Sequence, residues 1–384
     1  MKYLMATLLL CLCSLAAHAA TLQVGPDKTF TMPSQALAAA KDGDVIEIDA
    51  AVYEGDVSYV NPNNLTIRGV GAGRAVLDAK GKTAGRKGIF VTRGRNIIVE
   101  NIEFRHAGGE VNAAGIRAEG LDLTVRNCMF FECRDALLGG ADVVLIEFCE
   151  FSHCGHNSNP ATHNLYISER VSRLTYRHNY SHHTYEGHLL KTRAQENWIL
   201  YNRLTDEDGT GSAVADFPNG GVVVLIGNLL HKGAKGQNNR LIAYGMEGMR
   251  YATNALYVIN NTMVWDNRRA NEAGFVRVAR APEGFVPVIR NNLCIGPLAL
   301  FSGVPTADEA GNLVFKAAAE AGLADASVFD YRLKPDSPCR DKGVDPGLFG
   351  TIPLAPQMQY VHPARTEPRP ADGRFDCGAF EYKK

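Results

Sequence analysis

The chain has 384 residues, of which 46% are hydrophobic and 21% are charged, a balance typical of a folded globular protein. Its 40 Lys and Arg residues nearly equal its 41 Asp and Glu residues. This balance provides no basic field for nucleic acid and no polybasic patch for a membrane surface, so neither partner is expected. An anionic ligand would have to be held by local charges.

The N-terminus has the pattern of a cleavable export signal. Met1 and Lys2 precede an apolar run over 3–15, and Ala17-His18-Ala19 is a small-x-small cleavage site. The run is shorter than the ~20 residues that a helix needs to cross a bilayer. We therefore expect a signal peptide over 1–19, no membrane insertion of the mature chain, and a secreted or periplasmic location.

The segment over 20–60 is predicted to be the cap and first coil of a repeat structure. Residues 32–42 have the spacing of a short amphipathic helix, and residues 43–48 indicate a strand. An open solenoid end would expose core side chains and unpaired strand edges, which such a cap covers.

A short pattern of alternating apolar residues recurs over 61–300. One copy consists of Ile97, Val99, Ile102 and Phe104, and the third positions of successive copies are 21 to 33 residues apart. Period-two alternation indicates strands, and no helical period separates the copies. The pattern therefore predicts strands stacked coil on coil and excludes an alternating βαβ fold.

The third position of the pattern is often asparagine or cysteine. Cys128 and Cys149, and likewise Cys133 and Cys154, are 21 residues apart and are expected at equivalent positions of adjacent coils. We predict that the asparagines form an interior ladder of amides at a turn, where they satisfy backbone groups and one another. The predicted ladder consists of Asn179, Asn202, Asn228, Asn261 and Asn291.

A second strand precedes each copy of the pattern, and it becomes densely polar between residues 160 and 220. If Ile167 and Leu190 face the core, the alternate side chains point outward on one sheet, with coils ~4.8 Å apart. The expected outward set is Asn164, Tyr166, Ser168, Lys191 and Arg193. On the following coil Asp216 is expected roughly beside Arg193, with Asn219 in the turn that follows.

Histidines are concentrated in the same stretch, at 156, 163, 178, 182, 183 and 188. His163 lies before its strand and fits either a site residue or a loop cap. His188 is out of phase with Lys191 and fits either a ligand contact or a buried structural role. Glu186, at the strand entrance, fits either a ligand-binding residue or an ordinary turn acid.

From about residue 301 to 384 the pattern fades into C-terminal coils and a closing segment. Cys339 and Cys377 could form a disulfide there, because the export signal implies an oxidising compartment.

On these repeats the whole mature chain resembles the pectate-lyase-like superfamily. The resemblance implies an all-β fold, a right-handed parallel β-helix solenoid with an N-terminal capping helix. That scaffold carries lyases, hydrolases, epimerases, tailspikes and adhesins alike, so the function must be argued from the site.

The polar patch suits β-elimination in a uronic-acid polysaccharide. This reaction needs a base for the proton beside the carboxylate, an acid for the leaving oxygen, and positive charge near the carboxylate. We expect Lys191 to be the base, Arg193 to hold the carboxylate, and Tyr166 or His163 to be the acid. The predicted substrate-binding residues are Asn164, Ser168, Asp216, Asn219 and His188.

The segment from Glu186 to Lys191 is similar to a segment of the chondroitinase B and alginate lyase family. This resemblance implies that Lys191 is the base and that Glu186 binds Ca²⁺. The chain departs from the family because the acid Arg expected near 212–214 is absent. Asp206-Glu207-Asp208 offers other oxygen ligands, so a calcium cofactor is possible.

Two other functions remain open. A glycoside hydrolase needs two carboxylates beside the bond, for which Asp216 with Glu186 or Asp208 are the candidates. A non-catalytic glycan-binding or matrix protein would have the same solenoid with an inert patch. All three alternatives have a polysaccharide as the partner.

Overall fold

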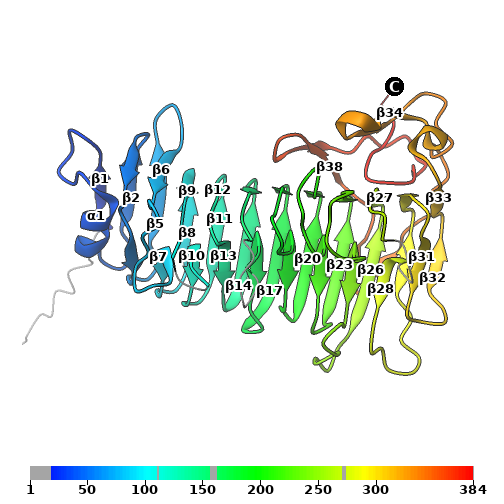
Figure 1. The fold of residues 1–384 in the computed structure, drawn as a ribbon, viewed down its shortest axis with the longest axis horizontal. Coiled ribbons are helices and arrows are strands. Elements are labelled where there is room, and N and C mark those ends of the chain that lie inside the picture. The colour runs from blue at the N-terminus through cyan, green and yellow to red at the C-terminus, as the bar shows by residue number, and fades with distance from the viewer. Residues whose placement is uncertain (1–18, 110–111, 156–161, 270–273, 384) are drawn as a thin grey trace, which may run out of the picture.

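The computed structural model describes residues 19–109, 112–155, 162–269 and 274–383. Three parallel sheets of 12, 11 and 10 strands wind around one long core, which confirms the predicted right-handed parallel β-helix. Figure 1 shows the coils stacked in a single row, with the capping helix at one end and the C-terminal segment beside the other. Within the described residues no helix is both long and apolar enough to span a bilayer.

The strands of each sheet follow one another coil by coil. The 12-stranded sheet contains β1 (Thr21–Val24), β2 (Val45–Asp49), β5 (Thr66–Val70), β8 (Ile97–Glu100), β11 (Leu123–Arg126), β14 (Asp142–Glu147), β17 (Val171–Arg177), β20 (Glu196–Leu200), β23 (Val222–Ile226), β26 (Ala255–Ile259), β29 (Val288–Arg290) and β32 (Asp308–Ala310). The 11-stranded sheet contains β3 (Val52–Glu54), β6 (Ala75–Asp78), β9 (Ile102–Arg105), β12 (Met129–Phe131), β15 (Glu150–Ser152), β18 (Tyr180–His182), β21 (Arg203–Thr205), β24 (Leu229–Lys232), β27 (Thr262–Trp265), β30 (Leu293–Ile295) and β33 (Leu313–Phe315). The 10-stranded sheet contains β4 (Ser58–Val60), β7 (Gly88–Thr92), β10 (Ala114–Ala118), β13 (Asp135–Gly139), β16 (Leu165–Ile167), β19 (Leu190–Thr192), β22 (Ala215–Phe217), β25 (Ile242–Tyr244), β28 (Gly274–Val278) and β31 (Ala299–Ser302).

The capping helix α1 (Pro33–Ala39) is shorter than the helix predicted over 32–42. It buries Ala36 and Leu37 against the first coil, as a cap should. The helix ends early because Asp44 accepts a hydrogen bond from the Lys41 backbone N–H at 2.8 Å, which places residues 41–44 in a turn. Most of the predicted signal peptide lies outside the described residues.

The register of the 12-stranded sheet agrees with the predicted repeat as far as β26. At the next coil the prediction is wrong by one residue, because Val258 lies beside Ile289 and not beside Val288. Ile289 is therefore fully buried, whereas Val286 is 47% exposed. A slip of one residue in a strand moves every side chain to the opposite face.

The amide ladder is present at the turn between the 12-stranded and 11-stranded sheets. The Asn202 Oδ1 accepts hydrogen bonds from the backbone and side-chain N–H groups of Asn179, and its own Nδ2 donates to Asn228 Oδ1 at 3.0 Å. The ladder continues through Asn261 to Asn292 and not to Asn291, as the register shift requires. In the other direction the Cys149 backbone N–H donates to Asn179 Oδ1, and Cys149 Sγ accepts the Cys128 backbone N–H.

The turns that join strands within a coil differ in length. From β8 onward, only one or two residues separate each strand of the 12-stranded sheet from the next strand of the 11-stranded sheet, and the first of them has a left-handed φ, as in Asn101, His178 and Asn260. Longer loops flank the 10-stranded sheet, such as 183–189 before β19 and 245–254 after β25. The coil therefore has one fixed corner and two variable ones.

The C-terminal segment folds back along the outside of the solenoid (Figure 1). It contains η1 (Ala318–Ala321), β34 (Leu323–Asp325), η2 (Ala326–Val328), β35 (Asp330–Leu333), β36 (Leu348–Phe349), β37 (Ile352–Pro353), β38 (Met358–Val361) and β39 (Arg365–Pro368). Tyr331 and Phe380 pack on Leu229 and Leu293 of the 11-stranded sheet. The segment thus closes part of that sheet from solvent.

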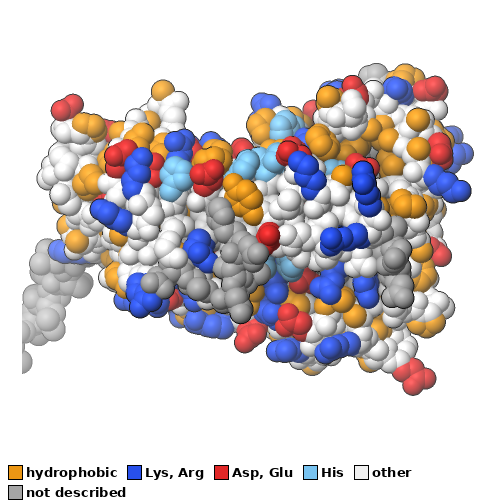
Figure 2. All heavy atoms as spheres, viewed as in Figure 1, with side chains coloured by type: hydrophobic (Ala, Val, Ile, Leu, Met, Phe, Trp, Pro, Cys, Tyr) orange, Lys and Arg blue, Asp and Glu red, His pale blue; other side chains and the backbone are white. Residues whose placement is uncertain are grey.

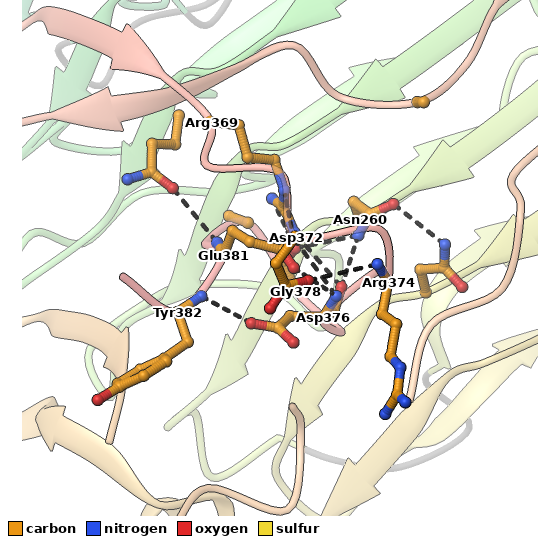
Figure 3. A network of polar contacts seen from close by, with 12 residues as sticks. Asn260, Arg369, Asp372, Arg374, Asp376, Gly378, Glu381 and Tyr382 are labelled. Carbon is orange, nitrogen blue, oxygen red and sulfur yellow. Dashed lines mark hydrogen bonds and ion pairs between the residues drawn. The ribbon is translucent and has the colours of Figure 1, made fainter. Parts of the chain in front are cut away.

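A polar network holds the end of this segment (Figure 3). Arg369 and Glu381 form a buried ion pair at 2.9 Å, and Asn260 Nδ2 donates to the backbone oxygen of Asp376 at 2.9 Å. The predicted disulfide between Cys339 and Cys377 is not formed. Both thiols are free, and the Cys377 backbone N–H donates to the Cys339 carbonyl at 2.9 Å.

Candidate functional site

A cavity of about 530 Å³ lies on the outer face of the 10-stranded sheet, over β10, β13, β16 and β19. Most of the residues that line it are polar or charged. They are Asn112, Arg117, Asp135, Leu138, Gly139, His163, Tyr166, Ser168, His188, Lys191 and Arg193. Six of the predicted site residues are therefore brought together in one place: His163, Tyr166, Ser168, His188, Lys191 and Arg193.

Tyr166, Lys191 and Asp216 occupy one register column. Tyr166 lies beside Lys191, and Lys191 lies beside Asp216, on three successive strands. The expected position of Asp216 beside Arg193 is wrong by two residues, because β22 pairs Ala215 with Leu190. The shared outer wall that brings the 160s, 190s and 210s together is nevertheless present.

Arg193 is held by groups that the sequence did not predict as partners. Its guanidinium forms two hydrogen bonds of 2.8 Å to Glu247, and it donates to Asn219 Oδ1 at 2.6 Å. These hydrogen bonds lower the pKa of Glu247, so this carboxyl is ionised at neutral pH. The predicted bidentate contact of Arg193 with the substrate carboxylate would require Glu247 to leave those donors. Asn219 is 2% exposed, and its side-chain oxygen accepts a hydrogen bond from Arg193.

Tyr166 is positioned by both cations. Arg193 Nε donates to the Tyr166 hydroxyl oxygen at 2.9 Å, and Lys191 Nζ lies 5.8 Å from the ring centroid. Because the hydroxyl oxygen accepts this bond, its own hydrogen is left to be donated into the cavity. Glu247 is also 3.7 Å from Lys191 Nζ, so the two cations share one carboxylate.

His163 is a neutral hydrogen-bond donor in this site. Its Nδ1 accepts the backbone N–H of His188 at 3.0 Å, which leaves the proton of the neutral ring on Nε2. Burial, together with the charges of His188, Lys191 and Arg193, lowers the pKa of His163 well below its usual range. The prediction of His163 as a catalytic acid is therefore disfavoured, because the histidinium form is scarce at neutral pH.

His188 lies in the same cavity as Lys191, although strict alternation placed the two in different phases. The alternation fails because β19 begins only at Leu190, and Leu189 and Leu190 are both buried. His188 Nδ1 accepts the backbone N–H of Ala213 at 3.2 Å, and its Nε2 lies 3.4 Å from Asp216 Oδ2. Asp216 thus orients His188.

Asn164 was expected to point outward, and this is wrong. Its side chain is fully buried, and Nδ2 donates to Ser181 Oγ and to the His182 carbonyl, both at 3.0 Å. Asn164 precedes β16, where the chain is still in the turn, so the strand period does not apply to it. Ser168 remains at the cavity wall, where its hydroxyl donates to the Gly140 carbonyl at 2.6 Å.

The predicted calcium ligands do not converge. Asp206 is fully buried and pairs with Lys232 at 2.8 Å, whereas Asp208 is exposed and lies 2.9 Å from His183. Glu186 is half-buried, and it remains a predicted ligand. Across the described ranges, no three His, Cys, Asp or Glu side chains are grouped so that they could hold a metal ion. The hydrolase alternative loses support, because its candidate carboxylates Asp216, Glu186 and Asp208 do not line the cavity.

The sequence cluster of histidines divides between different faces of the coil. His163 and His188 line the cavity, whereas His182 contacts Glu150 at 3.2 Å on the 11-stranded sheet. His178 stacks on Tyr201 at the short turn, and His156 lies outside the described residues. Figure 2 shows several histidine side chains among acidic and basic ones on the face in view. These histidines are therefore close in the sequence, but only His163 and His188 lie together at the cavity.

Asp135 is a site residue that the sequence reasoning missed. Its side chain is 1% exposed; Oδ1 accepts the His163 backbone N–H at 2.7 Å, and Oδ2 has no hydrogen-bond partner among the described residues. Burial raises the pKa of Asp135 to about 7. An acid directly before the apolar residues Ala136-Leu137-Leu138 of β13 was the signal in the sequence.

The family model described as "Right handed beta helix region" matches residues 50–263. The chain belongs to this right-handed β-helix family. No curated protein sequence matches the chain.

Solved structures with low sequence identity share the β-helix fold of this chain. The pectate lyase Pel9A is similar with a TM-score of 0.68 and 15% identity, over 95% of this chain and 96% of that chain. An alginate lyase from Paenibacillus sp. str. FPU-7 has a TM-score of 0.40 and 12% identity, over 78% of this chain and 98% of that chain. The PL6 family alginate lyase AlyGC has a TM-score of 0.40 and 12% identity, over 78% of this chain and 53% of that chain. The likeness to Pel9A concerns the fold.

The β-helix should become more stable at alkaline pH when Asp135 is replaced by asparagine. The folded state holds the Asp135 proton up to a pKa of about 7, against 3.8 in the unfolded chain, so Asp135 costs stability as pH rises from ~4 to ~7. About three pH units correspond to ~4 kcal/mol. The amide stays neutral and keeps the bond from His163.

Urea unfolding of both proteins at pH 4 and pH 8 measures this effect. We expect the Asp135→Asn variant to be the more stable protein at pH 8, with little difference at pH 4. An equal difference at the two pH values would contradict the raised pKa.

Proposed function

We propose that this protein is an exported polysaccharide lyase that cleaves a uronate-containing polysaccharide by β-elimination. The observation that carries the proposal is the column in which Lys191 lies between Tyr166 and Asp216, in a cavity that also contains Arg117 and Arg193. The pattern of an export signal at 1–19 and a fold shared with a protein named a pectate lyase support it.

Lys191 is the proposed base. Its neutral amine takes the proton from the carbon beside the uronate carboxylate, and the electrons of that C–H bond form a carbon–carbon double bond. The bond to the leaving oxygen breaks as the double bond forms. The cavity also contains Arg117 and Arg193, and their positive charge stabilises the negative charge that develops on the carboxylate.

Tyr166 is the proposed acid. Arg193 binds its hydroxyl oxygen, so the hydroxyl hydrogen is directed to another acceptor, which we assign as the leaving oxygen. The products are one chain with an unsaturated end and one with a new hydroxyl group. Arg193 is therefore a positioning residue, held in turn by Glu247 and Asn219.

The test is an incubation with a panel of uronate-containing polysaccharides, followed by ultraviolet absorbance of the new double bond. Absorbance that grows together with new chain ends supports elimination. New reducing ends without absorbance would indicate a glycoside hydrolase. Binding without either product would indicate a non-catalytic glycan-binding protein.

Replacing Tyr166 with phenylalanine should lower kcat by roughly 10²–10⁴, the usual contribution of a general acid. The ring and its contacts with His163 and Lys191 are retained, so KM should change little. Steady-state kinetics on the best polysaccharide of the panel measure both constants. Tyr257→Phe, on the 12-stranded sheet, is the matched control. A loss of kcat smaller than tenfold would exclude Tyr166 as the acid.

A further inference from the structure

Arg117 and Lys191 occupy the same register column at opposite ends of the cavity. Arg117 lies beside Leu138, and Leu138 lies beside Tyr166, the neighbour of Lys191. The two backbone positions are three strand spacings of ~4.8 Å apart, or roughly 14 Å. Leu138 and Gly139 form a small apolar floor between the two cationic ends.

The Arg117 end of the cavity has more positive charge than its carboxylate neutralises. The Arg117 Nε is 4.0 Å from Glu119, the limit of an ion pair, and the side chain is 29% exposed. The same Glu119 is hydrogen-bonded to Lys87 and lies 3.4 Å from Arg93. One carboxylate therefore faces three cations, whereas Arg193 at the other end is fully engaged by Glu247.

A buried polar atom lies at the same end. Asp135 lines the cavity together with Arg117 and Asn112, and its Oδ2 has no hydrogen-bond partner among the described residues. Burial raises the pKa of Asp135 to about 7, so the carboxyl carries a proton in mildly acidic solution. A protonated Oδ2 can donate to an anion, and it adds no repulsive charge.

We propose that Arg117, Asp135 and Asn112 form a second carboxylate subsite, which binds a uronate other than the one that reacts at Lys191. This inference rests on the proposed function and deepens it: the substrate is an extended polyuronate with repeated carboxylates. Arg117 binds the remote carboxylate bidentately, and more than one sugar lies between the two uronates, over Tyr166 and Leu138.

The test compares short and long oligouronates. Arg117→Gln should lower kcat/KM on an octasaccharide by roughly ten- to hundredfold, as the loss of a charged hydrogen-bond pair does. The trisaccharide, which cannot reach both ends, should be affected far less. Arg173→Gln, with a side chain 57% exposed on the 12-stranded sheet, is the matched control and should change neither value. Thermal unfolding of both variants checks that the fold is kept.

A binding measurement separates this inference from the proposed reaction. Calorimetry measures the affinity of two ligands: a saturated octauronate, and the same oligomer with its carboxylates reduced to alcohols. Each ligand is titrated into the Lys191→Ala protein and into the Lys191→Ala protein that also carries Arg117→Gln. The subsite is supported if Arg117→Gln weakens binding of the carboxylated oligomer and leaves binding of the reduced oligomer unchanged. This result would hold even if the wild-type protein forms no double bond. Equal losses on short and long substrates, or affinity independent of Arg117, would overturn it and leave the elimination proposal standing.

Discussion

Replacing Lys191 with alanine is expected to abolish elimination, with a fall in kcat/KM of at least roughly 10²–10⁴. The side chain is the amine at the centre of the column between Tyr166 and Asp216, and it lines the cavity on the outer face of the sheet, so its loss opens no cavity in the core. The unfolding temperature should therefore stay close to that of the wild type. Initial rates from the absorbance of the double bond measure the effect.

Two further variants show whether Lys191 acts as a base or only as a charge. Lys191→Arg keeps the positive charge but cannot take up a proton, so it should be as inactive as the alanine variant. Lys235→Ala removes a lysine that is 61% exposed and lies outside the cavity, and it should keep full activity. Activity of the arginine variant near the wild-type level would rule out Lys191 as the base.

Replacing Asn202 with alanine is expected to lower the free energy of unfolding by ~3–5 kcal/mol. Asn202 is fully buried, and its amide joins Asn179, Asn228 and the Tyr176 carbonyl. Its removal leaves several buried donors and acceptors without partners, each at a cost of ~1–3 kcal/mol. Urea unfolding of the variant measures the loss.

Asn61→Ala is the control for this prediction, because Asn61 is exposed in a loop and outside the ladder. It should change the urea midpoint little. Elimination measured well below the unfolding temperature should survive in the Asn202 variant, since Asn202 lies at another corner of the coil. A cost below 1 kcal/mol would show that the ladder contributes little to stability.

The fold was predictable because every coil needs buried apolar residues and a ladder asparagine at the same positions, so the repeat can be seen in the sequence. The alternation of Leu174 and Tyr176, followed by Asn179, fixes two strands and the turn between them. The predicted register failed at the last asparagine of the ladder, where two neighbouring residues fit the pattern equally well. Asn291 and Asn292 are adjacent, and only the pairing of β29 with β26 decides which of them enters the ladder.

The site was predictable within the strands and at the residue directly after each strand. Period-two alternation placed Tyr166 and Lys191 on one face, but it does not extend into the turns that contain Asn164 and His188. Glu247 could not be predicted, because its loop brings it to Arg193 across 54 residues of sequence. Strand periodicity gives no information about such loop-to-strand contacts.

The unequal corners of the coil bear on how such a protein can change its specificity. The short turn that contains the asparagines admits no insertion without breaking the amide stack, whereas the loops beside the 10-stranded sheet already differ in length from coil to coil. One of these loops carries Glu247 to the cavity rim. New recognition elements can therefore be grafted at those loops by exchanging segments, one coil at a time, while the scaffold keeps its architecture.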